Sequence, residues 1–493
     1  MSRRLVAAID QGTTSSRCII FDEAARPVAS AQRPHRQIHP RPGWVEHDAE
    51  EIWQAVQHCI AEAVAQLPGG ASAIAAIGIT NQRETCVVWD RASGKPIHNA
   101  IVWQDVRTEP LLASMAEQGG RDRFRASTGL PLASYFSAAK IAWILDSVEG
   151  ARDAARAGRL AAGTMDSWLI WKLTGRHVTD VTNAHRTQLM DLRSLAWDEA
   201  LLAAFNVPRG ILPEIASSSE IYGEARGTLA GIPVAGALGD QHAALVGQGC
   251  FGVGDTKCTY GTGNFLLSNC GPDPVFSNHG LLTTLAYRFG DEPPCYALEG
   301  SVAYTGALIQ WLRDGLGLIE SAAAVEALAA GVEDNGGAVI VPAFAGLFAP
   351  HWRPDARGVI AGLTAYVTSA HLARAALEAV AIQTHELVGA VRADGVAAPP
   401  MLRVDGGMTA NALLMQMQAD LLDLPVARAR IAETTCLGAA FAAGLATGVW
   451  ADRDAVRALA GEDSRWQPRR DAAWREMLLH GWRKAIGRSL DWA

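Results

Sequence analysis

One short segment near the start of the chain carries groups that could bind a phosphate and a cation: Asp10-Gln11-Gly12-Thr13-Thr14-Ser15-Ser16-Arg17. Its carboxylate can ligate the cation, while its hydroxyls, its glycine N–H and the Arg17 guanidinium can contact phosphate oxygens. Apolar runs at residues 5–9 and 18–21 flank the segment, so the pattern predicts a β-hairpin with the polar residues at its tip. The sequence has no Gly-Lys-Ser/Thr motif of a Walker loop. We therefore expect a hairpin turn to hold the phosphate.

Two later segments share this pattern of strand and glycine turn. Residues 257–269 read as strand, turn and strand around Gly261-Thr262-Gly263, and the apolar run at residues 402–404 ends at Asp405-Gly406-Gly407. A helical pattern follows at residues 411–422, and glycines that open a helix let a ligand approach the backbone and the positive end of the helix dipole. Each turn alone is typical of an ordinary loop. Because all three follow strands in two similar halves, we expect one ligand site between those halves.

Strand-like and helix-like segments alternate through the first half of the chain. Strand patterns occupy residues 5–9, 18–21, 73–79, 86–89 and 231–240, and helical patterns occupy residues 49–66, 111–118 and 137–145. This alternation predicts an α/β fold with helices packed on mixed sheets. Since the order of strand, turn and strand restarts at residue 257, we place a domain boundary near residue 250.

Length and composition exclude several classes of protein. A chain of 493 residues predicts two or three domains. The net charge of −8 argues against a nucleic-acid binder, and no apolar stretch is long enough to cross a membrane. The apolar run after the basic start ends at Asp10, too short for a secretory signal, and the eight cysteines form no CxxC pair. We therefore predict a cytoplasmic protein with reduced thiols, no nucleic-acid partner and no membrane insertion.

Nine short motifs follow one another along the chain, at residues 10–17, 42–48, 78–85, 135–137, 239–241, 259–263, 297–300, 309–314 and 404–407. Together they resemble the motifs of the FGGY carbohydrate kinases, a family in the actin-like ATPase superfamily. The run Asn81-Gln82-Arg83-Glu84-Thr85 is more similar to the glycerol kinase branch of that family than to its pentulose kinases. The resemblance covers nearly the whole chain.

The resemblance implies two ribonuclease-H-like domains that close on ATP and a polyol in an interdomain cleft. It implies an N-terminal domain at residues 1–249 that binds glycerol and phosphate. A C-terminal domain at residues 250–493 would bind the nucleotide and end in a helical tail. The implied reaction transfers the γ-phosphoryl group of ATP to glycerol and yields sn-glycerol 3-phosphate and ADP. A homodimer or homotetramer is also implied.

Phosphoryl transfer to an alcohol benefits from a carboxylate that accepts the hydroxyl proton, and Asp240, at a predicted strand end, fits the role of this base. Mg²⁺ prefers a few carboxylates plus waters, so Asp10 and Asp240 are the expected metal ligands. The resemblance implies that five side chains contact the phosphates: Thr13, Thr14, Ser15, Arg17 and Thr262. Taken without the resemblance, Asp240 is equally typical of a helix cap and Arg17 of a solvated strand residue.

A selective glycerol pocket needs several converging polar groups and an apolar wall. By resemblance, the polar groups belong to Arg83, Glu84, Tyr135, Asp240 and Gln241, and the wall to Trp103 and Phe265. The nucleotide would contact Gly306, Gln310, Gly407 and Asn411. Residue types alone would instead favour a surface ion pair for Arg83 and Glu84 and core packing for Trp103.

Three segments depart from the family pattern. His242 stands where a second glutamine is usual, and Phe348 and Arg353 replace a glycine and an aspartate in the loop at residues 347–353. The segment at residues 224–231 lacks the glycine-rich loop of members inhibited by fructose 1,6-bisphosphate, and the chain lacks the histidine that the sugar phosphotransferase system phosphorylates in other members, so we expect neither kind of control. The alternatives are a kinase for another polyol, a triose or a pentulose, and an actin- or Hsp70-like ATP-dependent clamp.

Overall fold

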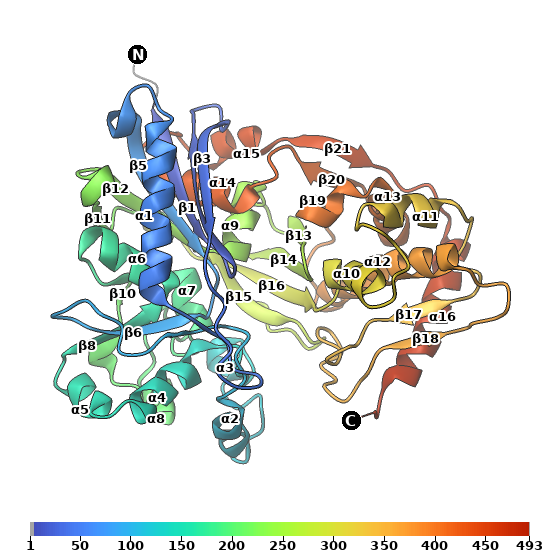
Figure 1. Ribbon diagram of the computed structural model, residues 1–493, viewed down its shortest axis with the longest axis horizontal. Helices are drawn as coiled ribbons and strands as arrows, with labels where there is room; N and C mark the ends of the chain where they lie inside the picture. Colours follow the sequence, from blue (N-terminus) through green and yellow to red (C-terminus); the bar gives the residue numbers. More distant parts are fainter. Residues whose placement is uncertain (1–3, 493) are drawn as a thin grey trace.

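Two β-sheets lie at the centres of the two halves of the chain, which the computed structural model describes over residues 4–492 (Figure 1). The strands of the first sheet are β1 (Leu5–Gln11), β2 (Ser15–Phe21), β3 (Pro27–Pro34), β5 (Ile74–Asn81), β11 (Gly223–Glu224) and β12 (Pro233–Gly239). Those of the second sheet are β13 (Thr256–Tyr260), β14 (Asn264–Gly271), β15 (Leu282–Tyr287), β16 (Cys295–Val302), β19 (Leu402–Asp405), β20 (Val426–Ala429) and β21 (Glu462–Trp466).

The two sheets share one topology. In the first, β3, β2 and β1 are antiparallel neighbours, β5 and β12 follow in parallel, and β11 is antiparallel at the edge. The second sheet repeats these directions in the same order, with the strands β16, β14, β13, β19, β20 and β21. Strand β15 adds one more antiparallel strand beyond β16. The restart of the strand pattern in the second half is therefore confirmed.

Helices and smaller sheets complete the two halves. The helices of the first half are α1 (Ala49–Ala65), α2 (Glu109–Ala116), α3 (Arg125–Thr128), α4 (Ser137–Ser147), α5 (Ala151–Arg156), α6 (Met165–Thr174), α7 (Val181–Arg186), α8 (Glu199–Phe205) and α9 (Asp240–Gly247). Those of the second half are α10 (Gly306–Asp314), α11 (Ala324–Ala330), α12 (Ser369–Ala393), α13 (Ala412–Leu422), α14 (Thr434–Ala446), α15 (Arg453–Ala460) and α16 (Ala472–Ser489). Short 3₁₀ helices occur at η1 (Gly70–Ala73), η2 (Arg209–Ile211), η3 (Gly227–Leu229) and η4 (Gly407–Ala410). The smaller sheets contain β4 (Glu46–His47), β7 (Ala100–Ile101), β6 (Cys86–Asp90) and β8 (Leu160–Thr164), then β9 (Val178–Asp180) with β10 (Glu214–Ala216), and β17 (Val339–Val341) with β18 (Val359–Ala361).

Local sequence explains where helix α1 begins and which face it buries. The Asp48 carboxylate accepts hydrogen bonds from the backbone N–H groups of Glu50 and Glu51, which caps the helix N-terminus. Ile52 and Val56 lie four residues apart on the face that packs against β2 and β3. The helix predicted at residues 49–66 is confirmed to within one residue of its end.

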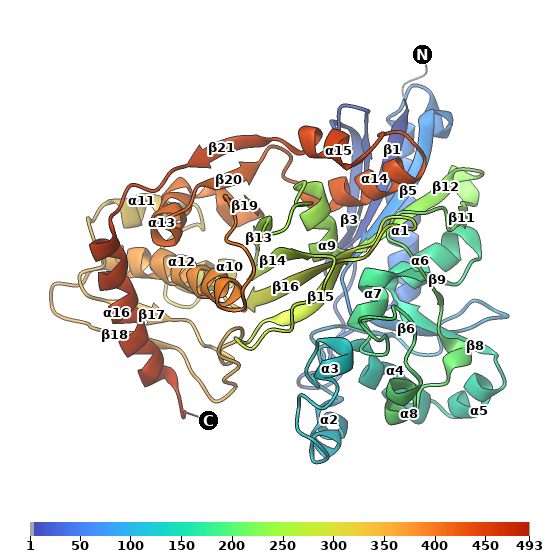
Figure 2. The same cartoon turned by 180° about the vertical axis from the view of Figure 1, so that it is seen from behind.

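Helix α14 belongs to the second half of the chain but lies on the first sheet (Figure 2). It packs against α9, β5, β12 and β1. Its backbone comes so close that a Cβ atom at Gly78 would collide with the carbonyl oxygen of Ala439, and one at Gly438 with that of Ala243. The core cluster here unites side chains from both halves, including Val6, Leu267 and Phe441. The two halves are therefore interlocked.

Three further features bear on the predictions. The glycine pair Gly406-Gly407 leads into the short helix η4, so it does not open α13 directly as the sequence pattern suggested. All eight cysteines carry free thiols. Within residues 4–492, no helix is both long enough and apolar enough to cross a membrane.

Candidate active site

The predicted phosphate hairpin is formed by β1 and β2. The Gly12 N–H donates to the Ser15 carbonyl oxygen over 2.9 Å, which closes the turn. Thr13, Thr14 and Ser15 therefore lie at the tip, with Thr14 exposed. The Trp103 indole Nε1–H donates to Thr13 Oγ1 over 3.0 Å, so this tip contacts one of the predicted wall residues.

Arg17 follows the tip on β2, directly across from Asp10. Its guanidinium forms an ion pair with Glu433, at the start of α14, and donates to Gln32 over 3.0 Å. The predicted contact between Arg17 and phosphate stays a prediction, because it requires Arg17 to exchange Glu433 for the phosphate.

Asp10, near the end of β1, and Asp240, directly after β12, lie close enough for their charges to interact. Burial raises the pKa of Asp10 to about 7; Arg17 opposes this rise, and the carboxylates of Asp240 and Glu433 add to it. Uncompensated negative charge of this kind suits a bound cation. Among the described residues, no three or more His, Cys, Asp or Glu side chains gather as a metal cluster. One or two carboxylates completed by waters are nevertheless the usual protein ligands of Mg²⁺.

Asp240 is the first residue of α9, directly after β12. Its Oδ1 lies 3.2 Å from Arg83 Nε, and one third (33%) of its side chain is exposed. The carboxylate is thus oriented by a neighbouring guanidinium while it stays accessible, as a proton acceptor for a bound alcohol must be.

Arg83 and Glu84 follow β5 and are both buried, at 3% and 1% exposure. Arg83 forms a bidentate ion pair with Glu299 of β16, with distances of 2.6 and 2.8 Å. Glu84 has a left-handed backbone conformation (φ +61°) and accepts a hydrogen bond from Arg186 Nε. The surface ion pair that residue types alone would favour is therefore wrong.

Trp103 and Tyr135 connect the hairpin to this pair. Their rings meet edge to face with centroids 5.6 Å apart, and the Arg186 guanidinium lies 5.3 Å from the Tyr135 ring. With the Thr13–Trp103 hydrogen bond, these contacts form a continuous path from the hairpin tip to Glu84. Six of the predicted residues are thereby brought together: Thr13, Arg83, Glu84, Trp103, Tyr135 and Asp240.

Two further predicted substrate residues lie where the halves meet. Gln241 is buried, and its Oε1 accepts a hydrogen bond from the buried Lys257 Nζ on β13. Phe265 is partly exposed on β14, where it pairs across the sheet with Thr259 and Ser301. Neither residue has a described polar contact with Arg83 or Glu84.

The second hairpin, β13 and β14, is held by the start of α10. The exposed Thr262 uses its carbonyl oxygen to accept from the N–H groups of Thr305 and Ala307, at 2.9 and 3.1 Å. A Cβ atom at Gly306 would lie 2.7 Å from the carbonyl oxygen of Gly261, so this packing alone requires a glycine. Gln310, on the same helix, is exposed.

The third turn contains two adjacent glycines, of which only the first is required by the backbone conformation and packing. Gly406 has φ +91°, and a Cβ atom there would lie 2.5 Å from the Tyr260 carbonyl oxygen. Gly407 is exposed, and a Cβ atom there would meet no protein atom within 4 Å. Asn411 caps α13, since its Oδ1 accepts from the Leu414 N–H over 2.8 Å. The side-chain oxygen of this predicted nucleotide ligand is thus already used.

Family models match the chain in two successive parts. The N-terminal domain of the FGGY family of carbohydrate kinases matches residues 5–247, and the C-terminal domain of that family matches residues 256–447. This chain belongs to the FGGY family of carbohydrate kinases. The two-domain α/β architecture predicted from the sequence is confirmed.

Relatives of this FGGY kinase match it from end to end. Glycerol kinase 2 of Streptomyces avermitilis is 60% identical, over 100% of this chain and 98% of its own. Glycerol kinase of Nocardia farcinica is also 60% identical, over 99% of both chains. The crystal structure of Plasmodium falciparum glycerol kinase with ADP has a TM-score of 0.93 at 38% identity, covering 99% of this chain and 98% of that one.

Sequence reasoning missed four charged residues of this FGGY kinase that contact the predicted site residues: Lys257, Arg186, Glu299 and Glu433. Glu299 offered a signal, because it is the single charge in the apolar strand β16 and lies in one of the family motifs. Arg186 offered none, because nothing in the mostly polar sequence of α7 marks this helix as buried. Lys257 and Glu433 were likewise indistinguishable by type from ordinary surface charges.

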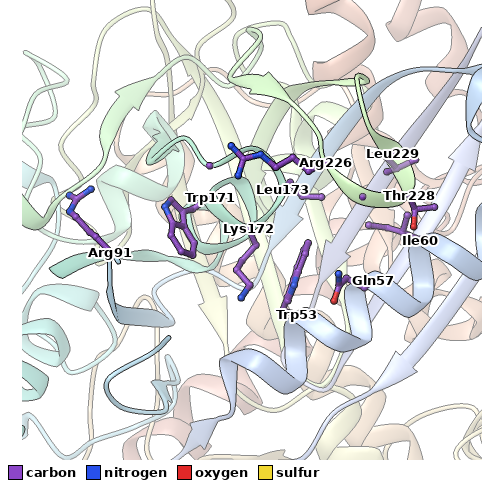
Figure 3. Close-up of a pocket in the computed structure, with 12 residues that line it drawn as sticks. Trp53, Gln57, Ile60, Arg91, Trp171, Lys172, Leu173, Arg226, Thr228 and Leu229 are labelled. Carbon is purple, nitrogen blue, oxygen red and sulfur yellow. The ribbon is translucent and has the colours of Figure 1, made fainter. Parts of the chain in front are cut away.

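A hollow of about 610 Å³ lies away from both hairpins of this FGGY kinase, between α1, α6 and the segment at residues 226–229 (Figure 3). Trp53, Trp171, Lys172 and Arg226 are among the side chains that line it. No site residue predicted from the sequence lies there. The expected absence of control by fructose 1,6-bisphosphate stays a prediction.

Proposed function

We propose that this FGGY kinase transfers the γ-phosphoryl group of ATP to a terminal hydroxyl of glycerol. The observation that carries this proposal is the accessible Asp240 carboxylate, which lies 3.2 Å from Arg83 at one end of a residue path that begins at the phosphate hairpin. Full-length relatives that are 60% identical and bear the name glycerol kinase support the choice of acceptor.

Asp240 would accept the proton of the attacking hydroxyl. The hydroxyl oxygen forms a bond to the γ-phosphorus while the bond from that phosphorus to the oxygen shared with the β-phosphate breaks. The products are sn-glycerol 3-phosphate and ADP, and the proton passes from Asp240 to solvent. The 3.2 Å contact with Arg83 keeps the Asp240 carboxylate oriented before transfer.

The acceptor pocket would use buried polar groups on one side and aromatic rings on the other. Arg83, Glu84, Tyr135 and Gln241 would bind the hydroxyls, and Trp103 and Phe265 would cover the C–H face. Buried polar groups that lose their partners are costly, so such a pocket selects strongly for a ligand that satisfies them. This supports a small polyol over a purely apolar alcohol.

The two hairpins would hold ATP from opposite halves. We propose that Thr13, Thr14, Ser15, Arg17 and Thr262 contact the phosphates, and that Gly306, Gln310, Gly407 and Asn411 contact the rest of the nucleotide. For Asn411, the Nδ2 amide is the group available, because Oδ1 caps α13. The exposed position of Gly407 supports close approach of a ligand to the backbone.

Asp10 and Asp240 would hold Mg²⁺, and the raised pKa of Asp10 supports a cation at this position. When bound, Mg²⁺ neutralises charge on the phosphate oxygens during transfer. We also propose the division into domains at residues 249 and 250, a cytoplasmic location and a homodimer or homotetramer. The oligomer rests on the family resemblance, the domain division rests also on the restart of the strand pattern at residue 257, and the location rests on the cysteine pattern and the short apolar run at the start.

The experiment that tests the proposed function measures ADP formation with and without glycerol in wild type and Asp240→Asn. We expect glycerol-dependent turnover that falls by about 10²- to 10⁴-fold in the variant, because the proton acceptor is lost. Asp153→Asn, at an exposed ion pair with Arg156, is the matched control and should keep normal turnover. Near-normal rates for Asp240→Asn would remove Asp240 from the base role.

Alternative acceptors belong in the same assay. Turnover on dihydroxyacetone, erythritol and D-xylulose is compared with turnover on glycerol at equal concentrations. Equal or better activity on D-xylulose would contradict the glycerol assignment, and ADP formation that is independent of every acceptor would instead favour an ATP-dependent clamp.

A further inference from the structure

Four fully buried charged side chains form one connected network behind the proposed acceptor pocket: Arg83, Glu84, Arg186 and Glu299. Arg83 and Glu84 come from the segment after β5, and Arg186 is the last residue of α7. Glu299 lies on β16, in the second half of the chain. The network thus joins the two halves at the substrate site.

Arg186 bridges the two carboxylates of this network. Its Nε donates to Glu84 Oε1, and its Nη1 lies 3.3 Å from Glu299 Oε2. The guanidinium also lies 5.3 Å from the centroid of the Tyr135 ring and 5.1 Å from that of Phe136. A planar guanidinium can make these contacts at once, whereas the point charge of a lysine cannot reproduce them.

Glu299 anchors the other half of the network. Its two oxygens accept from Nη1 and Nη2 of Arg83, which leaves Arg83 Nε directed toward Asp240 at 3.2 Å. Burial alone would raise the pKa of Glu299, but the guanidiniums of Arg186 and Arg83 hold it well below its usual range. Glu299 therefore stays ionised and keeps Arg83 in one orientation.

We propose that Arg186 and Glu299 are positioning residues for glycerol: Arg186 fixes Glu84 and the Tyr135 ring, and Glu299 fixes Arg83 toward Asp240. This inference rests on the proposed function, because it names the residues that hold the acceptor-binding side chains in place. Arg186 binds Oε1 of Glu84, and within residues 4–492 no side chain donates to Oε2, which is left for a substrate hydroxyl. Neither positioning residue needs to touch glycerol itself.

Stability alone does not account for the network. Replacing a buried ion network by apolar side chains of similar volume is often neutral or stabilising, so four buried charges are poor evidence for a merely structural role. Preorganised binding groups, in contrast, must keep one geometry before the ligand arrives. The network supplies that geometry with bidentate and bridging contacts.

Removing Arg186 should also change how the site responds to pH. Burial raises the pKa of Glu84, the guanidiniums of Arg186 and Arg83 oppose that rise, and Glu299 adds to it. Tyr135 and Lys140 are the other titratable groups that face Glu84. Without Arg186, Glu84 binds a proton more tightly, so glycerol binding by the ionised form should weaken as the pH falls.

The test compares Arg186→Lys, Arg186→Gln and Glu299→Gln with wild type by steady-state kinetics between about pH 6 and about pH 9. We expect the KM for glycerol to rise by about 10- to 100-fold in all three, because each loses hydrogen bonds to a charged group. The KM for ATP should stay within about twofold. Only Arg186→Gln should show a glycerol KM that falls steeply as the pH rises, since Arg186→Lys retains the positive charge.

Arg374→Lys is the matched control, because Arg374 is a buried arginine of α12 that pairs with Glu378. It should lower the melting temperature without changing the glycerol KM. If the Arg186 and Glu299 variants behave like this control, with lower stability and unchanged KM, the positioning role is overturned while the proposed function stands. If wild type shows no glycerol-dependent turnover, both are overturned. Should Arg186→Gln not fold, Arg186→Lys and Glu299→Gln still decide the outcome.

Discussion

At the proposed acceptor end of the site, Arg83 and Glu84 are buried and held by charged partners from two elements and both halves. At the proposed nucleotide end, Thr262, Gln310 and Gly407 are exposed, and the turn that carries Thr262 is held by backbone hydrogen bonds. The same strand-turn-strand topology thus supports two different kinds of surface.

This difference in burial indicates which interactions hold the side chains of each region in place. Side chains at the acceptor end are fixed by buried ion pairs, so changes there should affect stability and activity together. Side chains at the nucleotide end are solvated, so changes there should affect ligand affinity alone. Four predictions test this contrast.

The largest effect is expected for Arg83→Gln. This change leaves Glu299 with one charged partner and releases Asp240, so the free energy of unfolding should fall by about 3–5 kcal/mol and glycerol-dependent turnover should be lost. Urea unfolding and ADP formation measure the two outcomes. Arg17→Gln is the control for stability, because its partly exposed pair with Glu433 should contribute at most about 1 kcal/mol. Unchanged stability of Arg83→Gln would contradict a rigid acceptor end.

Substitutions at the two adjacent glycines of the third turn should affect different properties. One should change the free energy of unfolding, and the other should change the affinity for ATP. Gly406→Ala should lower the free energy of unfolding by about 1–3 kcal/mol, because φ is +91° and the Tyr260 carbonyl oxygen blocks a Cβ atom. Gly407→Ala should leave unfolding unchanged and raise the KM for ATP about tenfold, equivalent to about 1.4 kcal/mol. An unchanged KM for ATP in Gly407→Ala would remove Gly407 from the nucleotide site.

Between the two ends, Asp10 should make Mg²⁺ affinity depend on pH. With a pKa of about 7, its carboxylate binds a proton in competition with the cation, so the apparent affinity for Mg²⁺ with ATP should rise up to about tenfold per pH unit below pH 7 and level off above it. Protonated Asp10 also stabilises the folded state relative to the unfolded chain, and this contribution is lost as the pH rises toward about 7.

Titration calorimetry at several pH values measures the effect of Asp10. Asp10→Asn should abolish this pH dependence and should unfold less readily than wild type above about pH 7. A pH dependence that survives in Asp10→Asn would assign the titration to another group.

The smallest effect is expected for Gln310→Ala. Gln310 is exposed on α10 and has no described hydrogen bond, so its loss should raise the KM for ATP by about two- to threefold at most. Steady-state kinetics at saturating glycerol measures it. A rise of more than about tenfold would show that the nucleotide end also contains a tightly held group.

Local patterns in the sequence were sufficient for the hairpin and for the repeated sheet. Apolar runs on both sides of residues 10–17 predicted β1 and β2, and the restart at residue 257 predicted the second sheet. Both rest on short apolar runs bounded by polar and glycine-containing turns, which a single sequence contains. Helix α1 was predictable for the same reason, since it has a cap and a buried stripe.

Long-range partners could not be predicted in this way. The burial of Arg83 depends on Glu299, 216 positions later, and no spacing rule connects the two. The position of α14 was equally hidden, because its Ala- and Gly-rich segment is buried almost throughout and has no polar stripe to mark an outer face. The motif resemblance predicts which residues bind the acceptor, and the structure shows which partners hold Arg83 and Glu84.

Helix α14 has a consequence for the autonomy of the two family domains. Its backbone is in direct contact with that of β5 and α9, so shortening side chains would not separate α14 from these elements. A polypeptide that ended at residue 249 would expose to water the apolar face that α14 covers, including Val6 and Ala8. The two parts that the family models match separately therefore form a single unit of folding, and a chain divided between residues 247 and 256 should not give two stable halves.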